Sequence, residues 1–599
     1  MPASGIRRAA LATSLVALAL QAIPARDPDR LDVERHVEEK FKQARAFAHA
    51  AARNAGRSAA PLSQGSELPI TVEGRLNGVD VLTYDLSFSL DPAARYLEGR
   101  TVIRLSGVWA ETSELALDFD ESYTVSSVIR DETPIQPASF QGGRLTLTLD
   151  PPLRKEERTT LTILYGGAPP SYGALQFWRH GNDWAATSVA EPFGARTFWP
   201  CVDDPSDRAV VTVRVTVPAG YVSASAGLAS QETLPDGRNL TVWRLPEPIS
   251  TYLVSLNVAN YVTIEDRYVS RDGLTEMPIR SYVLPEHRDG NVSRLAALQD
   301  HLAVQASWFG EYPFLKTKYG IVEASFGGGM EHPTMTSIGT AQLGGVNNLT
   351  SLLVHELTHQ WWGDNVTMRT WDDLWLNEGF ATYGEVLYAE KSIGQAPGAL
   401  LATRYDDGRY AGALAQPVVA SASDPFRFTG SVYRKGAYAL HMLRRLVGDD
   451  TFFGALRTYG AQYSLGNASR ADLRRVFEEA SGLDLKYFFD QWLETPYRPT
   501  LRASYQNNLD FSRLAVVLEQ TQTHDVIHPE PRTGDLPTYR LEVPFRARLS
   551  DGSTLDGVLP ISGRSQAFSV PIPARKAVVS FTLDPDGDLL KVVEAITGS

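Results

Sequence analysis

Short runs in which apolar and polar residues alternate cover the chain from about residue 68 to residue 285. One example is Val210-Val211-Thr212-Val213-Arg214-Val215, and turn residues such as Asp150-Pro151-Pro152 separate the runs. Alternation with a period of two puts one face of each strand in a core and the other in solvent. The pattern predicts a large antiparallel β-domain over residues 68–285.

The hydrophobic period becomes helical after residue 285. It predicts helices over residues 292–309, 348–362, 374–391, 433–447, 451–463 and 470–480. Alternation returns from Pro499, as in residues 577–583. The sequence therefore predicts a multidomain α+β protein, with a mainly helical domain over residues 286–498 and a C-terminal β-sandwich over residues 499–599.

The first 25 residues have the pattern of a signal peptide. Arg7 and Arg8 precede an uncharged, mostly apolar segment, and the small residues Ala22 and Ala25 offer cleavage sites. We expect export, to a periplasm or out of the cell, with an uncleaved membrane anchor as the alternative. The sequence pattern of residues 26–67 predicts an amphipathic helix followed by a linker.

Composition narrows the classes of partner. The 599 residues are 43% hydrophobic and 21% charged, with a net charge of −13. This balance is that of a globular protein, and it argues against nucleic acid, which binds concentrated Lys and Arg. The single cysteine, Cys201, excludes an intramolecular disulfide in this sequence and is interpreted as a structural residue.

The segment His355-Glu356-Leu357-Thr358-His359 has the spacing H-E-x-x-H within a helical run. Residues four apart share one face of a helix, so both imidazoles can hold one ion. Glu356 lies off that line and can reach a water on the metal, as a general base must. The alternative is a pair of surface histidines on an ordinary helix.

A catalytic zinc ion with two histidine ligands needs a third protein ligand. Glu378, in Trp375-Leu376-Asn377-Glu378-Gly379-Phe380-Ala381, follows His359 after 18 residues, enough for a loop and the start of a second helix. Its apolar surroundings favour a buried, paired carboxylate. We predict one Zn²⁺ on His355, His359 and Glu378, with a fourth position open for water. Glu385 is a candidate to orient a ligand.

This constellation resembles the gluzincins, and among them the M1 family of aminopeptidases. Three further segments carry the resemblance, which extends over residues 75 to 500: Gly328-Gly329-Met330-Glu331-His332, similar to the family's G-x-M-E-N motif; Val432-Tyr433-Arg434-Lys435-Gly436-Ala437; and the stretch from Glu191 to Pro205. The resemblance implies a saddle-like β-domain, a thermolysin-like catalytic domain and a β-sandwich.

The resemblance also implies roles for individual residues. Glu331 binds the amino terminus of a peptide, and the backbone at Gly328, Gly329 and Met330 hydrogen-bonds the peptide. Tyr433 stabilises an oxyanion. Carboxylates beside a metal can hold an ammonium group by charge-assisted hydrogen bonds. From the residues alone, a flexible glycine loop and a core tyrosine stay open as alternatives.

Two further substrate-binding candidates are less secure on sequence grounds. Glu191 matches a position that lines the first specificity pocket in relatives, where it would be a second carboxylate near the ammonium group. By its own sequence it is a turn residue before Pro192. His332 stands where the family motif has Asn, and we expect it to support the loop or touch substrate, with metal binding as the alternative.

Together these features predict a zinc aminopeptidase that acts on peptides with a free amino terminus. Glu356 is the expected general base and Tyr433 the oxyanion stabiliser. One alternative is a thermolysin-like endopeptidase, which needs no ammonium anchor. The other is a catalytically silent peptide-binding protein on the same scaffold.

Overall fold

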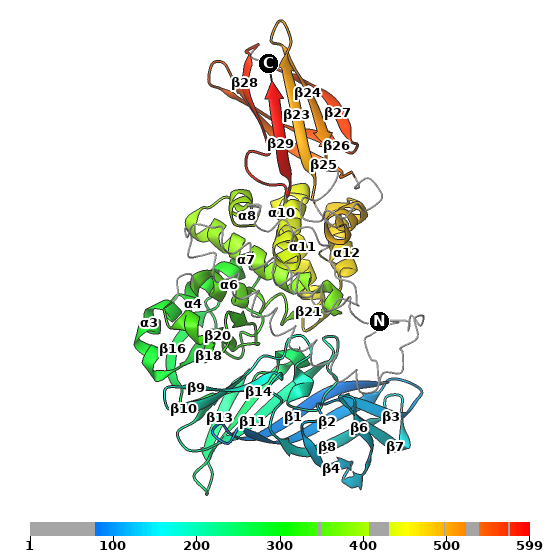
Figure 1. The fold of residues 1–599 in the computed structure, drawn as a ribbon, viewed down its shortest axis with the longest axis vertical. Coiled ribbons are helices and arrows are strands. Elements are labelled where there is room, and N and C mark those ends of the chain that lie inside the picture. Colours follow the sequence, from blue (N-terminus) through cyan, green and yellow to red (C-terminus); the bar gives the residue numbers. More distant parts are fainter. Residues whose placement is uncertain are drawn as a thin grey trace, which may run out of the picture.

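The computed structural model describes residues 78–345, 349–405, 418, 430–495, 498–522, 538–572 and 575–598. The predicted signal peptide, helix and linker of residues 1–67 lie outside this part. Figure 1 shows three parts along the long axis: β-sheets at the bottom, helices in the middle and a β-sandwich at the top. The predicted fold class is confirmed. Among the described helices, none has the length and hydrophobicity needed to cross a membrane.

The N-terminal part is built on an eight-stranded sheet. Its strands, in spatial order, are β13 (Leu228–Thr233), β14 (Asn239–Ser250), β11 (Arg208–Val217), β1 (Val79–Asp91), β2 (Tyr96–Gly107), β8 (Arg158–Gly167), β4 (Thr124–Arg130) and β5 (Thr133–Ile135). The prediction of an antiparallel sheet needs one correction, because β1 and β11 run parallel. The alternating pattern of each strand is the same for either direction of its neighbour, so the sequence could not show this.

Two smaller sheets complete the N-terminal part. They are β12 (Val222–Ala224), β15 (Asn257–Ala259), β10 (Asp183–Ser188) and β9 (Leu175–His180), and β3 (Glu111–Asp118), β7 (Arg144–Arg154) and β6 (Pro137–Gln141). The motif segment after Glu191 packs here: Trp199 is fully buried and meets Tyr84 of β1 edge to face, with ring centroids 4.7 Å apart. Cys201 is buried beside it, as its structural interpretation predicted.

The middle part begins with a five-stranded sheet, in the order β16 (Val262–Val269), β17 (Glu276–Val283), β18 (Ile321–Ala324), β20 (Thr336–Gly339) and β19 (Gly329–Met330). Its strands lie on both sides of residue 285, where the sequence predicts a domain boundary. A short parallel pair, β21 (Val366–Met368) and β22 (Gly466–Ala468), lies among the helices.

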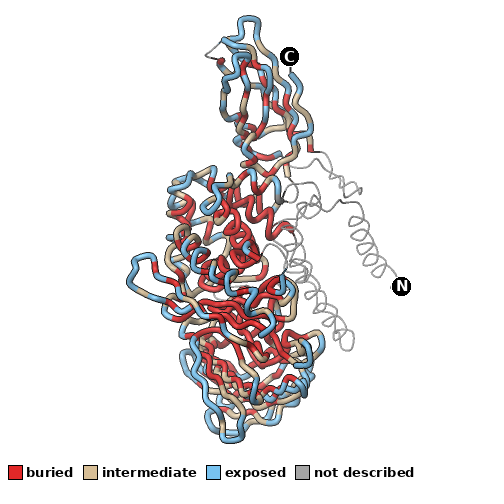
Figure 2. Tube along the Cα trace, turned by 90° about the vertical axis from the view of Figure 1, so that its left-hand side faces the viewer, coloured by how far each residue is buried: buried red, intermediate tan, exposed pale blue. Residues whose placement is uncertain are grey.

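Helices form the bulk of the middle part, and Figure 2 shows buried segments gathered in its interior with exposed segments toward the outside. They are α3 (Arg288–Ala296), α4 (Leu298–Phe309), α5 (Thr340–Leu343), α6 (Leu349–Thr358), α7 (Trp375–Ile393), α8 (Pro397–Tyr405), α10 (Gly436–Val447), α11 (Asp449–Gln462), α12 (Arg470–Ser481) and α13 (Lys486–Phe489). All six predicted helical segments contain helix, with ends that differ by several residues in places.

The C-terminal part is a sandwich of two sheets. One contains β27 (Ser565–Pro571), β24 (Arg513–Gln520), β23 (Thr500–Asn507) and β29 (Val592–Gly598), and the other β26 (Thr554–Ile561), β25 (Leu541–Leu549) and β28 (Val578–Leu583). Phe581 joins the two sheets, since its ring lies 5.4 Å from that of Tyr505 on the first sheet and 5.1 Å from that of Phe545 on the second.

The sandwich docks on the helices through the loop between β28 and β29. Asp588 in this loop places Oδ1 2.9 Å from Nε2 of His441, which is buried on α10, and Oδ2 3.1 Å from Nε of Arg445. Burial raises the pKa of Asp588, but the bond to His441 and the nearby Arg445 and Lys591 outweigh it, so the pKa lies below its ordinary value. The ionised carboxylate therefore stabilises this contact.

Asp588→Ala should destabilise the protein by about 1–3 kcal/mol, because the buried imidazole of His441 loses its carboxylate partner. The measurement is a thermal or denaturant unfolding curve. Asp586→Ala is the matched control in the same loop. The Asp586 side chain is 61% exposed and forms only a surface ion pair, 3.6 Å from Arg546, so its loss should change stability by less than about 0.5 kcal/mol. Equal effects of the two substitutions would contradict the docking role.

Candidate metal centre

The two histidines of H-E-x-x-H lie at the C-terminal end of α6. The helix ends at Thr358, short of the predicted residue 362, yet the N–H of His359 still donates to the carbonyl of His355 at 3.3 Å. The i,i+4 arrangement is therefore kept, and the two rings lie 4.9 Å apart on the same side.

Glu378 in the first turn of α7 completes a three-residue group. Its Oε2 lies 3.2 Å from Nε2 of His355 and 3.5 Å from Nε2 of His359. A tetrahedral zinc ion with bonds of about 2.0–2.1 Å puts neighbouring ligand atoms about 3.4 Å apart. Nε2 of His359 is buried and has no hydrogen-bond partner in the described chain. Both observations fit a zinc ion at this position.

A second group of converging ligand atoms shares His359. Within the described residues, Glu331, Glu356 and His359 also bring their atoms within 4.8 Å of one another. His355, His359 and Glu378 are the better candidate ligands of the two groups, because two imidazoles and one carboxylate form a known catalytic zinc set. With zinc on that set, Glu331 and Glu356 would lie next to the ion without being its ligands.

The outer nitrogens of both histidines are held in place. Nδ1 of His359 donates to the carbonyl of Trp362 at 3.1 Å, which leaves Nε2 as the nitrogen with a free lone pair. Nδ1 of His355 lies 2.9 Å from Oε1 of Glu385, as the sequence suggested, and Ser351 donates to the other oxygen of that carboxylate.

Negative charge dominates the electrostatics of this centre. Burial lowers the pKa of His355, but its hydrogen bonds to Glu378 and Glu385 outweigh burial and raise the pKa to about 10. The same carboxylates that favour a proton on this imidazole favour a metal cation beside it.

Tyr433 reaches the centre because two glycines let its segment approach α7. It lies in a π-helical turn, η5 (Ser431–Lys435), with its ring nearly parallel to that of His355 and 6.1 Å away. A Cβ atom on Gly379 would lie 3.1 Å from Cα of Gly436. Gly379 follows Glu378 directly, and Gly436 follows Tyr433 by three residues, so this contact brings a metal ligand and the tyrosine together.

The glycine run before Glu331 is explained by a second close approach. Gly329 on β19 lies against the Glu356 side chain, where a Cβ atom would be 2.4 Å from Oε1. Gly328 has a φ of +89°, and Met330 pairs with Ser337 of β20. The strand edge therefore runs directly over the expected general base, and Glu331, fully buried, follows it.

Glu191 and His332 are both buried near this edge. Burial raises the pKa of the Tyr252 phenol, and the negative charges of Glu331, Glu191 and Asp364 raise it further, so these carboxylates lie near one side chain. His332 lies with Nδ1 2.8 Å from Oγ of Ser337 on β20, which supports the loop. It belongs to neither group of converging ligand atoms within the described residues.

Two buried polar residues of this region, Gln360 and Asp364, were not predicted from the sequence. Burial raises the pKa of the Asp364 carboxyl well above its ordinary value, and the nearby Glu331 adds to the rise while Arg208 opposes it. Both residues follow H-E-x-x-H within an otherwise apolar segment, and that contrast was the available signal.

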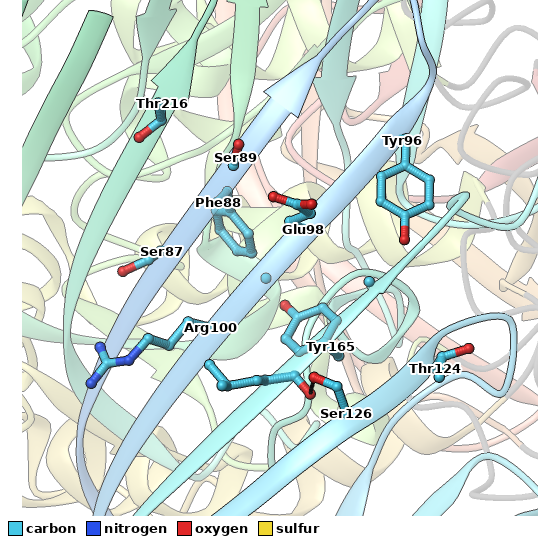
Figure 3. A pocket seen from close by; sticks show the side chains of 13 residues that line it. Ser87, Phe88, Ser89, Tyr96, Glu98, Arg100, Thr124, Ser126, Tyr165 and Thr216 are labelled. Carbon is cyan, nitrogen blue, oxygen red and sulfur yellow. Dashed lines mark hydrogen bonds between the residues drawn. The ribbon is translucent and has the colours of Figure 1, made fainter. Parts of the chain in front are cut away.

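A separate hollow of about 500 Å³ lies on the face of the eight-stranded sheet (Figure 3). Hydroxyl groups line much of it, with one acidic and one basic side chain, Glu98 and Arg100. None of the residues of the metal centre contributes to its walls. The hollow therefore has no part in the chemistry of the metal centre.

Comparisons with known proteins agree with this geometry. The peptidase M1 N-terminal domain model matches residues 81–253, and the peptidase family M1 domain model matches residues 295–492. The two matches together span more than half of the chain.

The chain belongs to peptidase family M1. Its cofactor is zinc, as in the M1 zinc metallopeptidase of Deinococcus radiodurans. That structure is 29% identical with a TM-score of 0.63, over 71% of this chain and 95% of the other. A mutant of that enzyme was solved with a bound Tyr-Ser-Ala substrate. The aminopeptidase A structure of Legionella pneumophila shares the fold, with a TM-score of 0.74 at 18% identity over 86% of this chain and 60% of the other.

Curated relatives of this M1 peptidase include mouse glutamyl aminopeptidase and aminopeptidase N of Streptomyces lividans. Each is 30% identical, over 55% and 53% of this chain respectively. The matched regions span 36% and 38% of those two proteins, little more than a third of their length.

Gly329→Ala should lower the peptidase activity of this M1 protein strongly while leaving its zinc content unchanged. The added methyl group collides with the Glu356 carboxylate, which must move, whereas the three metal ligands lie elsewhere. Turnover of an aminoacyl substrate and metal analysis of the purified variant test this.

Gly290→Ala is the control for the Gly329 substitution, since a Cβ atom there meets nothing within 4 Å. It should leave both activity and zinc unchanged. Full activity of Gly329→Ala would contradict the close packing of β19 on Glu356.

Proposed function

We propose that this M1 peptidase removes the amino-terminal residue from peptides. The observation that carries the proposal is the position of Glu331: a buried carboxylate within 4.8 Å of Glu356 and His359 that the metal does not need as a ligand. A carboxylate there suits a substrate ammonium group one residue from the bond to be cleaved. Glu191, buried nearby, is proposed to share that role.

The proposed chemistry divides among few groups. His355, His359 and Glu378 would hold the zinc ion, which would supply a Lewis acid for activating water and polarising the scissile carbonyl. Glu356 takes a proton from the attacking water and gives it to the leaving amine. The Tyr433 phenol donates a hydrogen bond to the developing oxyanion.

Support for an amino-terminal reaction comes also from related structures. The two-domain M1 zinc metallopeptidase was solved with L-arginine and with L-tryptophan, and the Deinococcus enzyme with a tripeptide. Single amino acids are the products, and short peptides the substrates, that an aminopeptidase takes. We extend this to the present chain as part of the proposal.

Glu356→Gln should reduce kcat by at least about a hundredfold, because the amide cannot accept the proton of the attacking water. Zinc content should stay at one ion per chain, since Glu356 is not among the assigned ligands. Glu479→Gln, a neutralised carboxylate whose side chain is 64% exposed on α12, is the control and should behave as the parent. Unchanged turnover in Glu356→Gln would exclude Glu356 as the base.

The activity itself is tested with a panel of aminoacyl fluorogenic substrates and their N-acetylated counterparts. Free amino termini should be hydrolysed, with a chelator abolishing the reaction and added Zn²⁺ restoring it. The N-acetylated substrates should react at least about tenfold more slowly, because they lack the ammonium group that Glu331 binds. Cleavage inside blocked peptides would favour a thermolysin-like endopeptidase.

A further inference from the structure

Gln360, the residue directly after the metal ligand His359, uses its whole side-chain amide. Nε2 donates to the carbonyl of Glu331 at 3.2 Å, with the His332 carbonyl as a longer alternative acceptor at 3.5 Å, and to Oδ2 of Asp364 at 2.7 Å. Oε1 accepts from the N–H of Thr334 at 2.8 Å and from Oη of Tyr312 at 3.0 Å. An amide offers two donors and two acceptor lone pairs, so this buried side chain has one satisfied orientation.

The segment that Gln360 holds is the loop between β19 and β20, which contains Glu331. Thr334 in this loop has a φ of +63°, a conformation that a branched residue adopts only when its surroundings impose it. Besides Gln360, Nζ of Lys318 donates to the carbonyl of Thr334 at 3.0 Å, and the N–H of Gly227 donates to its Oγ1 at 2.8 Å. Three separate residues, Gln360, Lys318 and Gly227, therefore hold the loop at Thr334.

The distance between the metal and the ammonium site is what an aminopeptidase must control. In a substrate, only one Cα atom separates the amino nitrogen from the scissile carbonyl, and a shift by one residue moves the chain by about 3.5 Å. Misplacement by about 1 Å can already cost a hundredfold in rate. In this structure a peptide bond joins His359 to Gln360, and a hydrogen bond joins Gln360 to the backbone of Glu331. These two bonds connect the metal centre with the ammonium site.

We propose that Gln360 is the positioning residue that sets the spacing between the metal centre and Glu331, and so fixes cleavage one residue from the amino terminus. This rests on the function proposed above. Gln360 touches neither metal nor substrate in this role. It acts through its hydrogen bond to the Glu331 carbonyl, while its bonds with Thr334 and Asp364 hold its own side chain in place.

The test compares two metal-binding inhibitors that differ only in the amino group: leucine hydroxamate and 4-methylpentanehydroxamic acid. The parent enzyme should bind the amino compound about 10- to 100-fold more tightly, through Glu331. Gln360→Glu puts an isosteric carboxylate in this place. It has no N–H to donate to the Glu331 carbonyl, and it faces the carboxyl group of Asp364. We expect the preference to fall below about threefold, with zinc content and the affinity of the des-amino compound unchanged.

Gln520 in the C-terminal sandwich provides a matched control. Its amide is also fully used: Nε2 donates to the carbonyls of Tyr539 and Gly563 at 2.7 and 3.2 Å, and Oε1 accepts from Tyr539 N–H and Gln522 Nε2. Gln520→Glu should lower the melting temperature and leave the inhibitor preference as in the parent. A fall in preference here would show that general destabilisation produces the effect.

Tyr312→Phe gives a second, milder variant if Gln360→Glu does not fold. It removes one donor to Gln360 and keeps the ring, so the preference should fall about two- to tenfold. A zinc-loaded Gln360→Glu with the parent's preference, or equal weakening of both inhibitors, would overturn the positioning role. A parent enzyme with no preference would instead contradict the proposed function itself.

Discussion

The concentration of buried carboxylates around one point shapes the rest of this structure. Glu331, Glu356, Glu378 and Glu385 lie within the protein interior near two histidines, at most 4% exposed. Negative charge in such a place is costly unless a cation or strong hydrogen bonds compensate it. The rise in the pKa of His355 expresses the same demand for positive charge. A divalent metal ion would compensate part of this negative charge, and the substrate ammonium group proposed here would compensate another part.

Close packing is what brings these groups together, and glycines permit it. Gly329 lets β19 lie on Glu356. The contact of Gly379 with Gly436 lets η5 place Tyr433 close to α6 and α7, the helices of the candidate metal ligands. Each of these glycines lies within three positions of Glu331, Glu378 or Tyr433 in the sequence. The short motifs around Glu331, Glu378 and Tyr433 thus each contain a polar side chain of proposed function and a glycine that allows another segment to approach closely.

The centre is supported by all three parts of the chain. Arg208 on β11 of the N-terminal part donates to the carbonyl of Asp364 at 2.7 Å, shortly after the end of α6 in the sequence. On the opposite side, Asp588 of the C-terminal part binds His441 on α10, the helix that continues from the turn carrying Tyr433. The relative positions of metal ligands, base and loop therefore depend on contacts between domains as well as on α6 and α7.

The sequence by itself determined what depends on local geometry. The spacing of His355 and His359 follows from the helical period, and the alternation of residues 68–285 and 499–599 follows from the period of a strand. Glu378 was predicted from the need of a catalytic zinc ion for a third ligand. The roles of Glu331 and Tyr433 came from family resemblance, because no local rule brings residues about 100 positions apart to one point. Only the tertiary structure decided the parallel pairing of β1 with β11, the two glycine contacts and the connection of Gln360 to Glu331. Hydrogen bonds and close contacts between distant segments leave no periodic signal in the chain, so they become visible only when the segments are packed together.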